Sequence, residues 1–417
     1  MEQQEIIPHL FRTEFRKITA VLCKHFGIAH IETAEDIASD TFLSAIETWT
    51  YKGLPANPTA WLYTVAKNKA KNYFHRRKIF SEKIINEIRK SSTDIEDAEI
   101  NLSQENITDS QLQMLFAICH PSIPAEAQIG LALRILCGFG INEIANAFLT
   151  NPETINKRLY RAREKLRDEK VKIEFPQTTE INSRLETVLT TLYLLFNEGY
   201  YSESDNNILR EDLCEEGMRL TYMLIENEET NKPKVNAVYA LMCFHSSRFA
   251  ARKNERGEMV LYQEQDESLW NQQLIIKGIY FLHEAAKGNE ISKYHLEAGI
   301  AYWHTIKSDT KEKWENILQL YNQLLMLEYS PVAALNRTYA LSKVKGKQEA
   351  IIEAEKLNLA NNHFYFTLLG ELYKDINSEK AKENFQKAFL LAKTITDKLT
   401  IQKKVECIEK TKNSRYS

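Results

Sequence analysis

Residues 140–167 read GINEIANAFLTNPETINKRLYRAREKLR, and this stretch decides how the chain is organised. Apolar residues recur at i, i+3, i+4 and i+7 in its first part, which predicts an amphipathic helix: Ile141, Ile144, Ala145 and Phe148. Asn151 and Pro152 can then cap and begin a second helix. That helix has its own apolar stripe, Ile155, Leu159, Ala162 and Leu166. The pattern predicts two short helices joined by a tight turn, a helix-turn-helix.

The second predicted helix is strongly basic. Between Pro152 and Arg167 there are six Lys or Arg residues and two Glu residues. Residues opposite the stripe can face a DNA groove, namely Glu153, Lys157, Tyr160, Arg161 and Glu164. Cations at the edges can reach phosphates, namely Arg158, Arg163, Lys165 and Arg167. A solvated, salt-bridged helix is the ordinary alternative for a charged run. The charge imbalance and the capped turn favour DNA binding.

Length and composition limit the other possibilities. The chain has 417 residues and a net charge of −3, so we expect two or three domains and only local basic surfaces. Its six cysteines are scattered without a CxxC pair, which predicts reduced thiols and neither a zinc site nor a disulfide framework. There is no secretory start and no apolar run long enough for a membrane span. We therefore expect a cytoplasmic protein with no metal, no cofactor and no membrane contact.

The first segment, to about Lys78, has a helical pattern throughout. Residues 65–78 hold six Lys or Arg residues and no acid, interleaved with Tyr73 and Phe74. Cations with flat aromatic faces suit opened nucleic acid. The aromatics can equally form a core. The spacing favours a core position for Trp61 and Val65 and leaves the others open.

An acidic stretch separates this segment from the next helices. Residues 81–109 are rich in acids and low in aromatics, which predicts a flexible linker. The helical pattern resumes at Gln111 and leads into the helix-turn-helix. The sequence thus predicts a basic helical domain, a tether and a second basic domain.

Together these stretches resemble the extracytoplasmic-function class of bacterial RNA polymerase sigma factors. Residues 34–49, AEDIASDTFLSAIETW, resemble the helix that grips the polymerase clamp. Residues 58–77, PTAWLYTVAKNKAKNYFHRR, resemble the segment that melts and reads the minus-ten element. Residues 143–167 resemble the minus-thirty-five reader. The resemblance implies RNA polymerase core, through its clamp helices and flap, and promoter DNA as partners.

The resemblance also implies roles for particular residues. Those expected to bind the polymerase are Glu35, Asp36, Asp40 and Phe42. Those expected to bind the minus-ten element are Lys52, Trp61, Asn68, Lys69, Lys71, Asn72, Arg76 and Arg77, with the loop of residues 51–57 helping Asn68 to hold a flipped base. Those expected to bind the minus-thirty-five element are Thr154, Asn156, Lys157, Arg158, Tyr160, Arg161 and Arg163.

The remainder of the chain predicts more helices and an internal repeat. Residues 252–268 form a Gly-containing stretch that predicts either a small hairpin or an irregular loop. Further on, one set of residues approximates the tetratricopeptide pattern: Leu369, Gly370, Tyr373, Ala381, Phe385 and Ala388. A second set echoes it about 34 residues earlier: Leu335, Asn336, Tyr339, Ala350 and Ala354. Such helix pairs stack into arrays that bind peptides or proteins, and a generic helical bundle is the alternative.

The whole chain resembles the sigma factor group with a tetratricopeptide-like C-terminal extension. The expected fold is all-α, with a polymerase-clamp and minus-ten domain over residues 1–80, the linker over 81–109, a helix-turn-helix domain over 110–173 and the extension over 174–417. The connection after Arg167 is short and has no Gly or Ser run, so we expect the extension to contact the sigma domains.

Two other classes of function were weighed against the sigma factor. A one-component regulator with an operator-binding helix-turn-helix and a sensing array leaves residues 1–78 unexplained. An enzyme is not expected, since the sequence has no phosphate loop, nucleophile elbow, HExxH or paired metal ligands.

Overall fold

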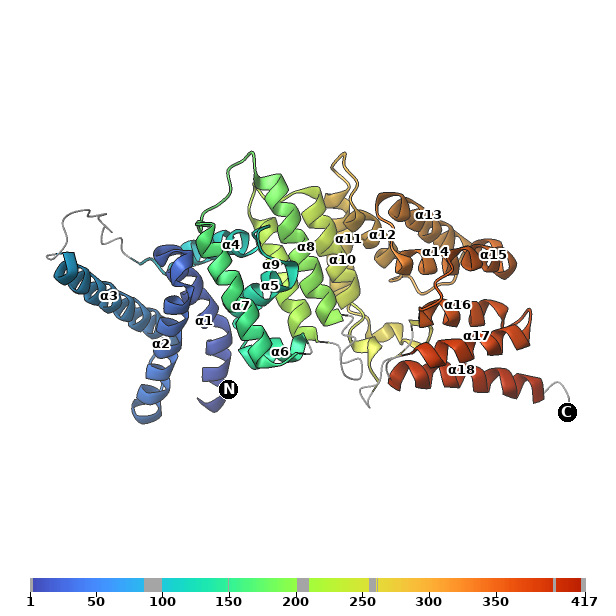
Figure 1. The fold of residues 1–417 in the computed structure, drawn as a ribbon, viewed down its shortest axis with the longest axis horizontal. Coiled ribbons are helices and arrows are strands. Elements are labelled where there is room, and N and C mark those ends of the chain that lie inside the picture. The colour runs from blue at the N-terminus through green and yellow to red at the C-terminus, as the bar shows by residue number, and fades with distance from the viewer. Residues whose placement is uncertain are drawn as a thin grey trace. The chain divides into compact units, whose positions relative to one another are not determined.

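The computed structural model describes residues 3–85, 100–148, 150–200, 210–254, 260, 262–392 and 395–413. In these residues the regular structure is helical, from α1 to α18 with short 3-10 turns and one π turn, and they hold no β-strand (Figure 1). The all-α prediction is confirmed. The chain divides into two compact units, Met1–Glu198 with Glu226–Thr230, and Gly199–Ile225 with Asn231–Ser417. The first unit therefore extends past the predicted boundary at residue 174.

Three helices open the first unit: α1 (Gln3–Phe26), α2 (Ile31–Lys52) and α3 (Pro58–Ile85). Each packs against the other two. The α3 helix contributes a fully buried stripe at i, i+4 and i+8, Leu62, Ala66 and Ala70, whose small alanines let the neighbouring helices approach closely. Trp61 and Val65, for which the spacing favours core positions, lie beside this stripe. Both are only partly buried, because the stripe lies one residue further along the helix.

Five helices follow in the first unit: α4 (Gln104–Ile118), α5 (Ala125–Leu131), α6 (Ile141–Ala147), α7 (Pro152–Asp168) and nearly all of α8 (Ile181–Tyr200). The π turn Ala132–Leu136 continues α5. The Asn151 side chain caps α7 by accepting a hydrogen bond of 2.8 Å from the Thr154 backbone N–H. The predicted stripe of α7 is buried in full: Ile155, Leu159, Ala162 and Leu166. The α6 and α7 helices pack together where the sequence predicts two helices and a capped turn.

The acidic linker was predicted over residues 81–109, and both of its ends are helical instead. The α3 helix continues to Ile85, and α4 begins at Gln104, before the predicted restart at Gln111. The Ser103 hydroxyl caps α4 by accepting a hydrogen bond from the Asn106 N–H at 3.4 Å. Residues 86–99 lie outside the described part of the chain.

The second unit is built from antiparallel helix pairs. It comprises most of α9 (Glu211–Glu226) and then α10 (Pro233–Ser246), α11 (Gln272–Ala285), α12 (Lys293–Trp303), α13 (Lys311–Leu327), α14 (Pro331–Lys345), α15 (Lys347–Leu357), α16 (His363–Tyr373), α17 (Ser378–Leu391) and α18 (Ile395–Asn413). Sequential helices from α12 to α18 pack against one another. The α10 helix is buried nearly all round, and α11 and α12 both pack on it.

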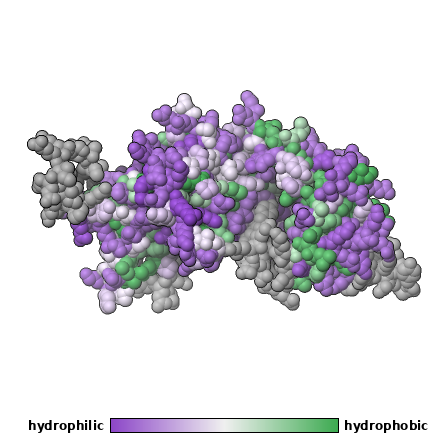
Figure 2. Space-filling view, viewed as in Figure 1, coloured by the Kyte–Doolittle hydropathy of each residue, from purple (hydrophilic) through white to green (hydrophobic). Residues whose placement is uncertain are grey.

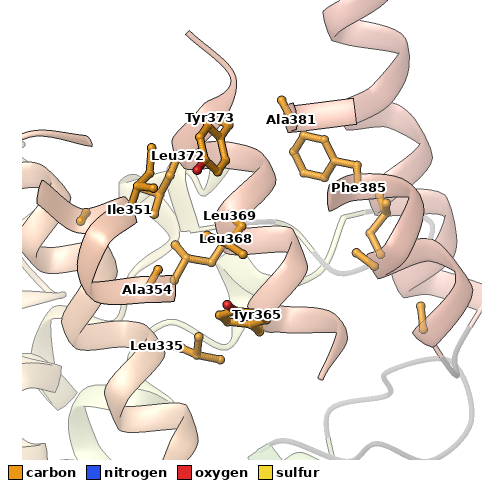
Figure 3. Close-up of a cluster of buried hydrophobic side chains, with 14 residues drawn as sticks. Leu335, Ile351, Ala354, Tyr365, Leu368, Leu369, Leu372, Tyr373, Ala381 and Phe385 are labelled. Carbon is orange, nitrogen blue, oxygen red and sulfur yellow. The ribbon is translucent and has the colours of Figure 1, made fainter. Parts of the chain in front are cut away.

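The α16–α17 pair holds the residues predicted to follow a tetratricopeptide-like pattern. Gly370 on α16 faces the Phe385 ring on α17, and a Cβ at Gly370 would lie 2.7 Å from that ring. Glycine is therefore required for this close approach. Around the contact lies one apolar cluster shared with α14 and α15, which includes Leu335, Ala350, Ala354, Leu369, Tyr373, Ala381 and Ala388 (Figure 3). The two predicted sets of repeat residues thus meet in one core.

The stretch predicted as either a hairpin or an irregular loop is irregular in its described residues. It contains the 3-10 turns Ala250–Arg252, Tyr262–Glu264 and Glu267–Leu269. The Val260 N–H donates to the Arg252 carbonyl at 2.8 Å and brings the two sides of the loop together. Residues 255–259 and 261 lie outside the described part.

Candidate nucleic-acid and polymerase interfaces

One face of α7 is open and polar. Its exposed side chains are Asn156, Lys157, Tyr160 and Arg161, and Thr154 and Arg158 are partly exposed. Lys157 forms an i,i+4 ion pair with Glu153 at 2.6 Å, in which both side chains are well exposed. A surface pair of this kind contributes little to stability, so Lys157 is easily released to another anion. The α7 helix therefore presents six of its seven predicted DNA-binding residues to solvent.

An open groove of about 500 Å³ runs beside this face. Its cations are Lys157, Arg158, Arg161 and Lys165, and its other wall is Ser122, Ile123, Pro124 and Ala127. Arg158 lies over the Phe148 ring, 5.4 Å from its centroid, which fixes the guanidinium at the rim. The hydrogen bond from Lys165 to Glu169 raises the pKa of the lysine, so it stays charged. Four cations in a groove suit the phosphates of a nucleic acid.

Arg163 does not share that face, and its predicted role as a DNA contact is not supported in this arrangement. It donates to Glu35 at 2.8 Å and also pairs with Glu32 at 3.5 Å. Glu35 accepts a second hydrogen bond from Arg134 Nε at 2.9 Å. The Arg163 and Glu35 side chains are only 13% and 8% exposed. We call these four residues the clasp.

The clasp belongs to a wider contact between the first three helices and the next four. The α1 helix packs against α4 and against the π turn, and α7 packs against the 3-10 turn Ile28–His30. Lys24 on α1 pairs with Asp109 on α4 at 2.5 Å. Cys23 is fully buried nearby, and burial, followed by the Glu35 charge, raises the pKa of its thiol. The two basic domains predicted from the sequence are therefore in direct contact.

The α2 helix presents a mixed acidic and apolar face. Asp36 and Asp40 are exposed, as predicted, and Leu43 is 53% exposed one turn further along. Ile46 and Glu47 continue the same face. Figure 2 shows apolar surface over this part of α1 and α2. An apolar stripe flanked by acids suits a helical partner with apolar and basic side chains.

Two of the predicted polymerase-binding residues do not lie on that face. Phe42 is buried in the domain core, 5.0 Å from the Phe11 ring by centroids. Glu35 is buried in the clasp. Both predictions are corrected here, because adjacent helical residues point about 100° apart. Leu43 lies on the exposed face but is not among the predicted polymerase-binding residues. Its helical spacing shows the shared face, since Asp36, Asp40, Leu43 and Glu47 follow one another at intervals of four, three and four residues.

The α3 helix carries most of the predicted minus-ten residues on one exposed face. Asn68, Lys71, Asn72 and Arg76 follow at i, i+3, i+4 and i+8 and are all exposed. Lys52 is exposed at the end of α2, and Lys69 and Trp61 are partly buried. The side chain of Arg77 lies outside the described part. This arrangement places amides between cations, which allows contacts to both bases and phosphates.

The aromatic residues of α3 are used in packing. Phe74 and Tyr73 lie 4.8 Å and 5.8 Å from the Phe26 ring by centroids. The Tyr63 hydroxyl donates to Glu14 at 2.6 Å, and burial, followed by this bond, raises the pKa of the phenol. The Trp61 ring meets Trp49 at 5.3 Å. Of the two alternatives left open by the sequence, a core role fits these rings.

The loop before α3 is fixed at its end by Asn57. Its side chain accepts a hydrogen bond of 3.0 Å from the Ala60 N–H and so caps the helix, with Pro58 as first residue. Tyr51 and Lys52 remain exposed at the start of the loop. Ala56 and Asn57 are exposed at its other end, so both ends of the loop are open to solvent.

The α8 helix (Ile181–Tyr200) contacts the α4 and α5 region directly. The Arg184 guanidinium donates to the Phe116 carbonyl at 2.5 Å, and the Thr191 hydroxyl donates to Gln128 Oε1 at 2.6 Å. Thr191 also lies beside Cys119, whose pKa burial raises to about 12. These polar contacts, one partly buried and one buried, join residues after position 174 to the helices before it.

Metal and membrane sites are absent from the described residues. They contain no group of three or more His, Cys, Asp or Glu side chains placed to hold a metal ion. Five cysteines among them are free and buried. No helix among these residues combines the length and apolarity needed to cross a membrane.

Two family models match parts of the chain. Residues 10–79 match Sigma-70 region 2, and residues 184–286 match a family of unknown function, DUF6596. An uncharacterized protein of Rhizobium meliloti (strain 1021) is 29% identical over 386 residues, which are 90% of each chain. No solved structure matches significantly. The Sigma-70 region 2 match covers most of α1, all of α2 and most of α3, so the similarity to sigma factors, a family that binds RNA polymerase core and promoter DNA, is carried by these three helices.

Proposed function

We propose that this chain is a sigma factor of the extracytoplasmic-function type, which directs bacterial RNA polymerase core to specific promoters. The observation that carries the proposal is the Sigma-70 region 2 match over residues 10–79, the same helices that expose the Asp36 and Leu43 face and the Asn68 and Arg76 face. An operator-binding regulator needs neither face. In the proposal, α2 binds the polymerase and α3 binds the minus-ten element.

The upstream element is then read by α7. Tyr160 and Arg161 lie exposed at the centre of its open face, suited to base edges, and Lys157, Arg158 and Lys165 line the groove beside it. The contact is of the kind made by a reader helix in a major groove. Arg163 joins the DNA contacts only when the clasp is open.

The residues after position 174 are proposed to regulate the sigma domains by direct contact. Arg184 makes a partly buried hydrogen bond to α4, and Thr191 makes a buried one to α5, which packs against α7. The apolar face of α8 is buried as well, including Ile181, Leu185, Val188 and Leu189. Removal of α8 exposes the apolar surface that this face covers and leaves Gln128 without its Thr191 partner. We therefore expect truncation before Glu180 to change transcription several-fold.

The proposal is tested by reconstitution with bacterial core polymerase and a promoter library, with initiation sites read by sequencing. The full chain should direct initiation from a defined set of promoters. Leu43→Asp should abolish initiation and weaken core binding at least about tenfold, because it places a charge in an apolar contact. Leu390→Asp, at an exposed leucine of α17 in the second unit, is the matched control and should keep activity. Core polymerase that never initiates with the wild-type chain overturns the proposal.

A further inference from the structure

Basic residues gather at one end of the second unit, where α10 ends and α13 begins. Arg248 follows α10, Arg252 closes the 3-10 turn Ala250–Arg252, and Lys313 lies in the first turn of α13. We call these three residues the cationic cluster. All three lie far in sequence from the DNA-binding and polymerase-binding faces, and the proposed sigma function gives them no role.

The cluster is buried. Arg248 is 8% exposed and Lys313 is 1% exposed, while Arg252 is partly buried. Withdrawing a charge from water costs several kcal/mol or more unless an opposite charge or a full set of hydrogen bonds compensates, so buried cations are normally paired. In the described part of the chain, none of the three cations forms an ion pair.

Hydrogen bonds offset the cost of burying the Lys313 charge better than they offset the cost of burying the two arginine charges. Lys313 donates to the Tyr262 hydroxyl at 3.0 Å and to the Ile306 carbonyl at 2.5 Å. Arg248 donates through one terminal nitrogen to the Tyr200 hydroxyl at 3.2 Å. Its Nε and one terminal nitrogen of Arg252 are buried without a partner in the described residues. Two guanidinium groups thus keep unused donors inside the fold.

Aromatic rings hold both guanidinium groups in place. The Arg252 guanidinium lies 3.8 Å from the Tyr200 ring centroid, and the Arg248 guanidinium lies 5.4 Å from the Tyr262 centroid. A guanidinium held against a ring face still has in-plane N–H donors at its edges. The indole N–H of Trp270, whose ring stacks on that of Tyr262, is also buried and has no partner among the residues that the structure describes. The side chains around the two arginines therefore add a further N–H donor to those of the guanidinium groups.

Two neighbouring groups respond to burial first and to the charges of the cluster second. Burial, and then the charges of Arg248 and Lys313, lower the pKa of His304 to about 3. Burial lowers the pKa of Lys313 to about 8, and Arg248 and Lys343 act in the same direction against Asp309. Asp309 itself is exposed and pairs with Lys343 at 2.9 Å. A chain with a net charge of −3 thus concentrates positive charge here.

We propose that the cationic cluster binds the oxyanion group of a small ligand, either a phosphate or a carboxylate, between Arg248 and Arg252. Paired planar guanidinium groups with free edge donors match the two or three oxygens of such a group. The rings of Tyr200 and Tyr262 and the Trp270 N–H complete the site. The second unit is thereby a receptor for an anionic small molecule, whether or not the first unit is a sigma factor.

The test is thermal unfolding of the full chain in sodium phosphate and, separately, sodium malonate, each at about 50 mM and compared with sodium chloride of equal ionic strength. A ligand at about fifty times its Kd raises the Tm of a domain of this size by about 5 °C. We expect such a rise with at least one of the two anions. A rise in Tm with phosphate alone indicates a phosphorylated ligand, and a rise with malonate alone indicates a carboxylate ligand.

The variants separate this site from other cations. Arg248→Met should lose the anion-dependent rise and keep or increase the Tm in chloride, since it removes a buried unpaired charge. If that variant does not fold, Arg252→Met carries the same expectation. Arg161→Ala, in the α7 groove, and Arg337→Met, which pairs with Glu353, should both keep the rise. No rise with either anion, or a rise that survives both cluster variants, overturns the proposal.

Discussion

Replacing Glu35 by glutamine should loosen the contact between the first three helices and α4–α7. The change keeps the size of the side chain and removes the charge that Arg134 and Arg163 share. All three side chains are less than a quarter exposed, so solvent screens the lost interaction only partly. Breaking a buried pair from one side costs about 3 to 5 kcal/mol at most.

Other contacts reduce that figure. In the variant, Arg163 still forms its ion pair with Glu32 at 3.5 Å, and Arg134 still donates to the Phe139 carbonyl at 3.1 Å. The glutamine side-chain oxygen can also accept one of the two original hydrogen bonds. We therefore expect Glu35→Gln to lower the free energy of unfolding by about 2 kcal/mol, measured by urea denaturation of the full chain. Glu32→Gln is the matched control. Its carboxylate is half-exposed, so its loss should cost less than about 0.5 kcal/mol.

DNA binding supplies a second measurement. An open clasp frees Arg163 for a phosphate, so Glu35→Gln should steepen the dependence of duplex-DNA affinity on salt by about one unit. Adding Arg163→Ala should remove that gain. If Glu35→Gln and Glu32→Gln are equally stable and have equal salt slopes, the clasp does not hold the domains together and the reasoning fails.

Three other outcomes follow from the structure. Arg161→Ala should cost about 1 to 3 kcal/mol in promoter binding, measured by anisotropy, and relax the preference at one upstream position; unchanged specificity would show that α7 is misassigned. Thr191→Val should lower the free energy of unfolding by about 1 kcal/mol, because it leaves Gln128 Oε1 without its buried donor, and Thr190→Val on the exposed side of α8 should be neutral. The free energy of unfolding should fall as the pH drops below about 6.5. His304 binds a proton in the unfolded chain at that pH, whereas its pKa of about 3 in the folded chain keeps it neutral. In urea denaturation, His304→Gln should reduce the change of the unfolding free energy with pH by up to about 1.4 kcal/mol per pH unit between pH 6.5 and 5.

Local features were predictable from the sequence because their causes are local. Asn151 and Pro152 fix the start of α7 by capping geometry within one turn, and the α7 stripe follows from helical periodicity. Periodicity is less reliable where apolar residues are adjacent. Leu43 next to Phe42, and Trp61 next to Leu62, each offer two stripes about 100° apart, and only packing against a neighbour selects one.

The clasp and the cationic cluster could not be predicted because their residues are distant in sequence. Arg163 and Glu35 are 128 positions apart, and each alone looks like an ordinary surface charge. Arg248 and Tyr200 are 48 positions apart and meet only once α10 is packed. Sequence patterns report the period of a helix, and they carry no information on which charge faces which across a domain contact.

The clasp separates two kinds of polymerase contact on α2. The Asp36 and Leu43 face is exposed in the same structure in which Glu35 is covered, so a partner can bind that face without opening the clasp. A partner that also requires Glu35 must compete with Arg134 and Arg163. Only such a partner releases Arg163, and by reciprocity phosphates that capture Arg163 then favour that partner. Coupling between such a partner and DNA therefore depends on Glu35, and Glu35→Gln should abolish it, because the variant weakens binding of that partner and leaves Arg163 free for DNA whether or not the partner is bound.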